Sequence, residues 1–125
     1  CRCSITLGRL FGVINKKGLN GCVELLGYVP RDYLIHLYET SQIAVMPSLY
    51  EGLPMVGLEL ASAGLPIVAT ETARIQDVIC DENIDLLVPR RESKRFAKRV
   101  GYLLESLERS INIGKRNAKR CNGVL

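Results

Sequence analysis

The sequence predicts an open, doubly wound α/β fold, in which helices cover both faces of a parallel sheet. Five short runs of mostly apolar residues alternate with helical stretches along the 125 residues, at positions 5–7, 23–26, 43–46, 67–69 and 86–88. Continuously apolar runs are typical of parallel strands that are buried on both faces. The chain has the length of one domain with its own core.

Three helices are expected between or after these runs. Residues 31–40 place Leu34, Ile35, Leu37 and Tyr38 at helical spacing. Residues 91–107 carry an apolar stripe opposite a basic face, formed by Phe96, Val100, Leu103, Leu104 and Leu107. A helix over 55–63 begins after Pro54 and ends at Gly64, because proline suits a first helical turn and glycine a helix end. The basic tail after residue 112 is expected to fray.

Composition limits the classes of partner and site. The absence of Trp and the few aromatics argue against a single-stranded nucleic-acid surface. Five scattered cysteines and one histidine, His36, predict neither a zinc site nor a disulfide framework. We therefore expect no metal and a cytoplasmic location. We expect His36 to be a packed or surface residue rather than a catalytic one.

The distribution of charge and the first residue of the sequence give two further expectations. The net charge of +4 is concentrated in residues 90–99 and 115–120. These residues are interpreted as a solvated helix face, the alternative being attraction to an anionic membrane surface or an acidic ligand. No apolar run is long enough to span a membrane. Because Cys1 stands where an initiator methionine would be, we expect residues 1–125 to be a single domain cut from a longer protein.

The segment 47–59 carries the candidate site. It follows a predicted strand and leads into a predicted helix, and ligands of doubly wound folds bind at such carboxyl-edge loops. Gly52 permits a tight turn and a close backbone approach by a ligand. The free backbone N–H groups near Met55, Val56 and Gly57 are suited to bind a phosphate.

Glu59 is the only ionisable residue between positions 52 and 70. The helix around it is apolar on nearly all sides, so Glu59 is expected to be buried. An unpartnered carboxylate there would cost several kcal/mol. Two explanations stay open: a structural pairing with a backbone donor or a distant arginine, or a pocket in which Glu59 accepts hydrogen bonds from a polar ligand. Glu51, at the loop tip, adds weight to the second.

Residues 47–70 resemble the signature of the group 1 family of retaining glycosyltransferases. The resemblance rests on two glutamates separated by seven residues, Glu51 and Glu59, the loop 51–55, and the run 60–70. It extends over roughly residues 20–105. It implies that the chain is the Rossmann-like donor-binding half of a two-domain GT-B fold, transferring a sugar from a nucleotide-sugar to a glycan, lipid or other acceptor.

The resemblance also implies residue roles. Glu59 would bind the ribose diol of the donor. Glu51 would lie beside the transferred sugar, position it and stabilise positive charge at its anomeric carbon. Backbone at Gly52, Leu53, Met55 and Val56 would hold sugar hydroxyls and phosphate. The loop at Gly27 and Tyr28 would lie beside the nucleotide base. The donor would be UDP- or GDP-linked, with no metal or other cofactor.

The match is incomplete at the start of the chain. Family members hold the donor diphosphate with an arginine and a lysine, in a sequence pattern that Arg9 and Lys17 match. Only four residues separate Gly18 from Val23, where the family has a further helix, strand and helix. We therefore favour aligning residues 5–7 with the second strand, which makes Arg9 a loop cation and places the basic pair upstream. The amino-terminal GT-B domain, which supplies the acceptor site, is expected outside this sequence.

Other classes remain as alternatives. The strongest is a non-catalytic module that keeps the fold and binds a nucleotide or a partner protein. A sugar-nucleotide epimerase or a phosphorylase on the same fold is weaker, since different ligands would be expected at the carboxylate loop. A receiver-like domain is weaker still, because no acidic pair ends the first predicted strand.

Overall fold

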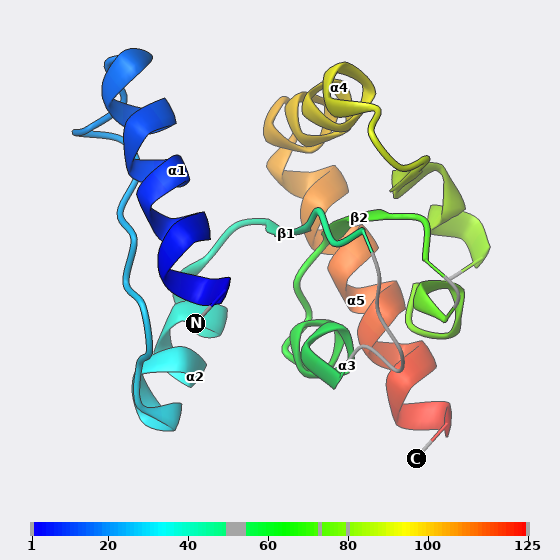
Figure 1. Cartoon of the computed structure of the whole chain (residues 1–125). Helices are drawn as coiled ribbons and strands as arrows, with labels where there is room; N and C mark the ends of the chain where they lie inside the picture. Colours follow the sequence, from blue (N-terminus) through cyan, green and yellow to red (C-terminus); the bar gives the residue numbers. More distant parts are fainter. Residues whose placement is uncertain (1, 50–54, 73, 80, 125) are drawn as a thin grey trace. The chain divides into compact units, whose positions relative to one another are not determined.

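A computed structural model describes residues 2–49, 55–72, 74–79 and 81–124, which belong to two compact units, residues 1–31 and 32–125. The larger unit carries a parallel sheet of β1 (Ala44–Met46), β2 (Ile67–Thr70) and β3 (Leu87–Val88), in the order β1-β2-β3 (Figure 1). Val45 pairs with Val68, and Ala69 with Leu87. The predicted α/β class and the strands expected at 43–46, 67–69 and 86–88 are confirmed.

The two faces of the sheet are covered by different helices. Strand side chains alternate between faces, and β2 is buried throughout. Ile67 and Ala69 pack with Leu60 of α3 (Met55–Ser62) and Cys121 of α5 (Leu107–Val124). Val68 packs instead with Leu103 of α4 (Ser93–Leu104) and Ile113 of α5. The sheet is therefore doubly wound, and α5 contributes to both cores.

The smaller unit corrects two predictions. Residues 5–7 lie in α1 (Arg2–Lys16), not in a strand. Leu10, Phe11 and Ile14 have helical spacing, and Ile14 is buried whereas Leu10 and Phe11 are exposed. Residues 23–26 form no strand either.

These corrections change the alignment at the start of the chain. Arg9 is an exposed residue of a helix rather than a loop cation, and Lys17 is exposed in the turn that follows. The favoured alignment of 5–7 with a strand is therefore wrong. The helix α2 (Arg31–Thr40) has the predicted bounds, and His36 on it is exposed.

The end of α3 is fixed by a turn at Gly64. The N–H of Leu65 donates to the Leu60 carbonyl at 3.1 Å, and the N–H of Gly64 to the Ala61 carbonyl at 2.9 Å. With Gly64 at φ 78°, this is the left-handed helix end that glycine favours. Gly114 of α5 lies directly against this turn, so that a Cβ atom there would meet the Gly64 carbonyl group. The turn and α5 are thus in backbone contact.

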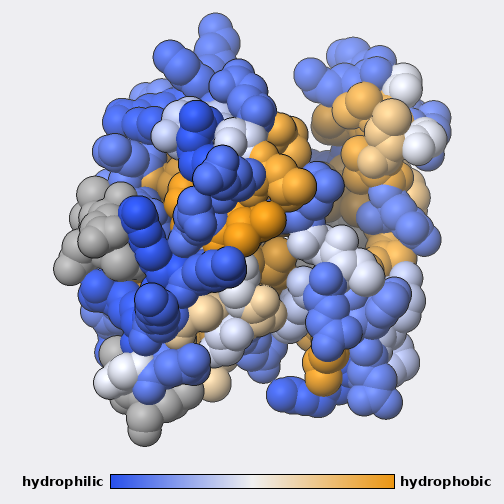
Figure 2. Space-filling model, turned by 180° about the vertical axis from the view of Figure 1, so that it is seen from behind, coloured by the Kyte–Doolittle hydropathy of each residue, from blue (hydrophilic) through white to orange (hydrophobic). Residues whose placement is uncertain are grey.

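The carboxyl-terminal region is more ordered than predicted. The helix expected over 91–107 is confirmed over 93–104 as α4, but Leu107 starts α5 instead, and α5 continues to Val124, where fraying had been expected. The predicted stripe holds only in part, because Leu104 and Leu107 are 61% and 62% exposed. Figure 2, from behind, shows hydrophobic surface bordered by hydrophilic side chains. No helix in the described part of the chain could cross a membrane.

A buried polar contact joins α5 to the segment before β3. That segment, η2 (Asp81–Leu86), is a 3₁₀ helix. The Asn83 side-chain amide donates to Oδ1 of Asn117 at 3.1 Å and to the Ile113 carbonyl at 3.4 Å. Asn83 and Asn117 are 4% and 0% exposed.

The Cys121 thiol is buried on the same helix, α5. Its burial raises the pKa of the thiol, although Arg120 and the Ser62 hydroxyl act in the opposite direction.

We expect Asn117→Ala to lower the free energy of unfolding by about 2 kcal/mol, because it leaves the buried Asn83 amide short of an acceptor. The matched control is Asn112→Ala, an exposed asparagine of the same helix. Urea denaturation followed by circular dichroism measures both. Equal losses in the two variants would contradict a stabilising role for the Asn83–Asn117 contact.

Candidate functional site

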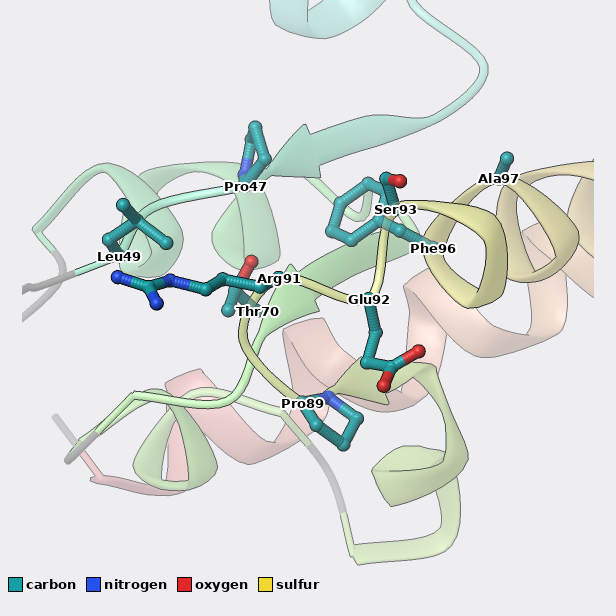
Figure 3. A pocket seen from close by; sticks show the side chains of 9 residues that line it. All are labelled: Pro47, Leu49, Thr70, Pro89, Arg91, Glu92, Ser93, Phe96 and Ala97. Atoms are coloured by element: carbon teal, nitrogen blue, oxygen red, sulfur yellow. The ribbon is translucent and has the colours of Figure 1, made fainter.

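The carboxyl ends of the three parallel strands meet at one edge of the sheet, where a pocket of about 310 Å³ opens. The segments after the strands contribute Pro47, Leu49 and Pro89, and β2 contributes its last residue, Thr70. The rest of the lining comes from the start of α4 and the residues before it, namely Arg91, Glu92, Ser93, Phe96 and Ala97 (Figure 3). The pocket occupies the position where doubly wound folds bind ligands.

Two polar groups of this pocket were not predicted as site residues. Thr70 is 6% exposed, and no hydrogen bond joins its hydroxyl to another described residue. Arg91 has a φ of 65°, in the left-handed region that side chains other than glycine's rarely adopt. Thr70 directly follows the apolar run 67–69, and ligands of doubly wound folds bind at the carboxyl ends of such strands, so Thr70 had a signal. Arg91 had none, because it belongs to a basic run typical of a solvated helix.

Glu59 lies on α3, at the border of the core. Its Oε2 accepts a hydrogen bond of 3.2 Å from the Tyr38 hydroxyl of α2. The face of α3 formed by Gly57, Leu60 and Ala61 is buried, whereas Glu59 is only half-buried. The expectation of a buried Glu59 is therefore wrong, because only one face of this apolar helix meets the core.

The first two side chains of α3 are exposed. Met55 and Val56 are 59% and 52% exposed. Since the first N–H groups of a helix have no partner within it, this end can donate to an anion or to hydroxyls. The predicted site residues Glu51, Gly52 and Leu53 lie outside the described residues. Glu59, Met55 and Val56 thus share one helix, with the carboxylate just over one turn from its start.

The predicted base-binding loop belongs to the smaller unit. Gly27 has a φ of 64°, and Tyr28 is 96% exposed. Both precede residue 32, whereas α3 belongs to the larger unit. The structure therefore places Glu59 with Met55 and Val56 on one helix of the larger unit, and Gly27 and Tyr28 in the smaller unit.

Comparison with known proteins finds one family. A family model described as "Glycosyl transferases group 1" matches residues 8–120. A D-inositol 3-phosphate glycosyltransferase of Corynebacterium urealyticum is 29% identical over 75% of this chain, and the O-antigen chain mannosyltransferase B of Escherichia coli 32% over 60%. The chain covers 22% and 20% of the length of these relatives.

The fold also matches a solved structure. A sucrose-phosphate synthase from Thermosynechococcus elongatus has a TM-score of 0.85 and 25% identity, over 92% of this chain and 29% of that one. The predicted resemblance and the GT-B fold class are both confirmed by these matches.

Proposed function

Because this chain belongs to the group 1 glycosyltransferases, we propose that it forms the donor-binding half of a retaining, metal-independent enzyme. In this proposal the enzyme transfers a sugar from a UDP- or GDP-linked donor to a hydroxyl-bearing acceptor such as a glycan. The observation that carries the proposal is Glu59, a half-buried carboxylate on a mostly apolar helix whose first two side chains are exposed.

The geometry of α3 supports donor binding at two points. Met55 and Val56 at its start are exposed, and the first N–H groups of a helix have no partner within the helix, which favours phosphate. Further along, Glu59 is half-buried, and its carboxylate accepts a hydrogen bond from the Tyr38 hydroxyl. A charged acceptor of this kind contributes about 1.5–3 kcal/mol per hydrogen bond, which suits the two hydroxyls of a ribose.

The remaining roles rest on the family resemblance. We assign Glu51 to the transferred sugar, the backbone at Gly52 and Leu53 to its hydroxyls, and Gly27 and Tyr28 to the base. In a two-domain fold the second domain holds the acceptor and closes the cleft. Transfer needs an acceptor within about 3–3.5 Å of the anomeric carbon and the exclusion of water. The 125 residues alone are therefore expected to bind a donor weakly and not to complete transfer.

The setting of the reaction is part of the proposal. The two curated relatives act, by their names, on an inositol phosphate and on an O-antigen chain, so polysaccharide or glycoconjugate synthesis at the cytoplasmic membrane face is a suitable role. The exposed cations Lys94, Arg95 and Lys98 of α4 provide a surface for anionic lipid headgroups. This contact would be peripheral.

We expect Glu59→Ala to weaken the binding of UDP- or GDP-type donors by about tenfold or more, the equivalent of one good hydrogen bond. Isothermal titration of the full-length protein measures the dissociation constant. Glu39→Ala is the matched control, because Glu39 is an exposed glutamate of α2, the helix that also carries Tyr38. Unchanged donor affinity in Glu59→Ala would rule out the ribose role.

A further inference from the structure

We infer that the pocket at the carboxyl edge binds a small phosphorylated sugar or polyol, whose phosphate is held by Arg91 and Thr70. This inference goes beyond the proposed donor site. Glu59, Met55 and Val56 do not line the pocket. All nine lining residues belong to the larger unit and to described parts of the chain.

The Thr70 hydroxyl is the first observation that points to a ligand. The residue is 6% exposed and lines the pocket as the last residue of β2. Its hydroxyl has no hydrogen-bond partner in the described chain. Among the described residues, the Thr70 hydroxyl is not one of the enclosed polar atoms that lack a partner, so it is open to the pocket, where water can reach it. A ligand oxygen in the pocket would take the place of that water.

Arg91 is the second observation. Its guanidinium has no acidic partner among the described residues, and it extends across the pocket toward Leu49 on the same side as Thr70 (Figure 3). The planar guanidinium can donate two parallel hydrogen bonds to a phosphate. Its φ of 65° is unfavourable for an arginine, and such backbone strain is found mainly at functional sites.

The start of α4 adds a third group of donors. This helix has 12 residues, and the side chain of its N-cap residue, Glu92, makes no capping hydrogen bond. The Glu92 side chain therefore does not cap the first N–H groups of α4. These groups lie in the pocket wall, because Ser93, the first residue of α4, lines the pocket. Helix starts favour anions, so these groups act in the same sense as Arg91.

The other features favour a sugar phosphate over phosphate alone. The volume of about 310 Å³ is at the lower end for small-molecule sites and exceeds what a phosphate fills. Pro47, Pro89 and Phe96 offer apolar surface to the C–H groups of a ring. The Glu92 carboxylate points away from the Arg91 guanidinium (Figure 3). There it would accept hydrogen bonds from sugar hydroxyls rather than repel the phosphate.

The test is titration of the full chain with glucose 6-phosphate, followed by amide chemical shifts. We expect saturable binding that Arg91→Gly weakens by about tenfold or more. Arg91→Gly should leave the melting temperature equal or higher, because glycine adopts φ 65° freely. Thr70→Val should weaken binding severalfold and Thr70→Ser should restore it. Lys115→Ala, an exposed cation of α5 outside the pocket, is the control and should change nothing.

Three outcomes would overturn the inference. One is equal affinity of Arg91→Gly and the unaltered chain. A second is inorganic phosphate binding as tightly as glucose 6-phosphate, which would remove the role of the ring. The third is displacement of glucose 6-phosphate by UDP-glucose, which would make the pocket part of the donor site. Glu59→Ala should leave this titration unchanged, so failure of the donor-site proposal can be told apart from failure of this one.

Discussion

Substitution of Gly114 by alanine is expected to destabilise the protein by about 3 kcal/mol or more, at the upper end of the cost of overpacking. A Cβ atom at this position would overlap the Gly64 carbonyl oxygen and lie 2.8 Å from the carbonyl carbon. Both atoms are backbone, so no side-chain rotation relieves the clash. Helix propensity alone predicts a gain of about 1 kcal/mol from Gly→Ala, so the sign of the result distinguishes the two effects.

Thermal denaturation measures this effect, with Gly101→Ala as the matched control. Gly101 also lies in a helix, α4, but a Cβ atom added to it would meet no other atom within 4 Å. It should therefore show the stabilisation that propensity predicts. If Gly114→Ala raised the melting temperature as Gly101→Ala does, α5 and the Gly64 turn could not be in the contact described.

The second large effect is expected for Glu51→Gln in the full-length enzyme. The proposed role of Glu51 is to stabilise positive charge that develops during transfer, so its loss should act on the transition state more than on the bound donor. We expect kcat to fall by about a hundredfold, in the range found for removal of one electrostatic stabiliser. The KM for the donor should change little.

Steady-state kinetics with a radiolabelled donor gives both constants. Glu105→Gln, which neutralises an exposed glutamate at the end of α4, serves as the control. A rise in KM at unchanged kcat would contradict the assignment. It would instead indicate that Glu51 contributes only to donor binding.

The sheet and the central helix could be predicted because their signals are local. The runs that became β1, β2 and β3 are short and apolar, and such runs are stable only when buried on both sides. The bounds of α3 followed from Pro54 and Gly64, since the special backbone preferences of these two residues depend little on distant contacts. Tyr38, by contrast, gave no signal that it would contact Glu59.

The errors arose where a local run is ambiguous. Residues 5–7 are mostly apolar, but the spacing of Leu10, Phe11 and Ile14 continues one helix through them. A run of three residues cannot distinguish a strand from part of a helix. The tail after residue 112 was judged on its charge, yet Ile113, Asn117 and Cys121 recur every four residues and are buried. Tertiary packing orders this helix.

The part of the candidate site on α3 could be predicted, whereas the pocket could not. Glu59 and the start of α3 follow from a long motif, although the degree of burial of Glu59 does not, because it depends on which face of α3 meets α5. The pocket around Thr70 and Arg91 depends on three strands ending together and on one unusual φ angle. Neither property can be obtained from residue types along the chain.

The contact between Gly114 and the Gly64 turn also constrains the order in which the protein can mature on the ribosome. The segment from β1 to β2, with α3 between them, is synthesised well before Gly114 emerges. Until then the apolar face formed by Leu60, Ala61 and Ile67 lacks the helix that covers it. Nascent chains stalled before residue 114 should therefore expose this face to chaperones and proteases. The helix that carries Glu59 becomes fixed only when α5 is complete.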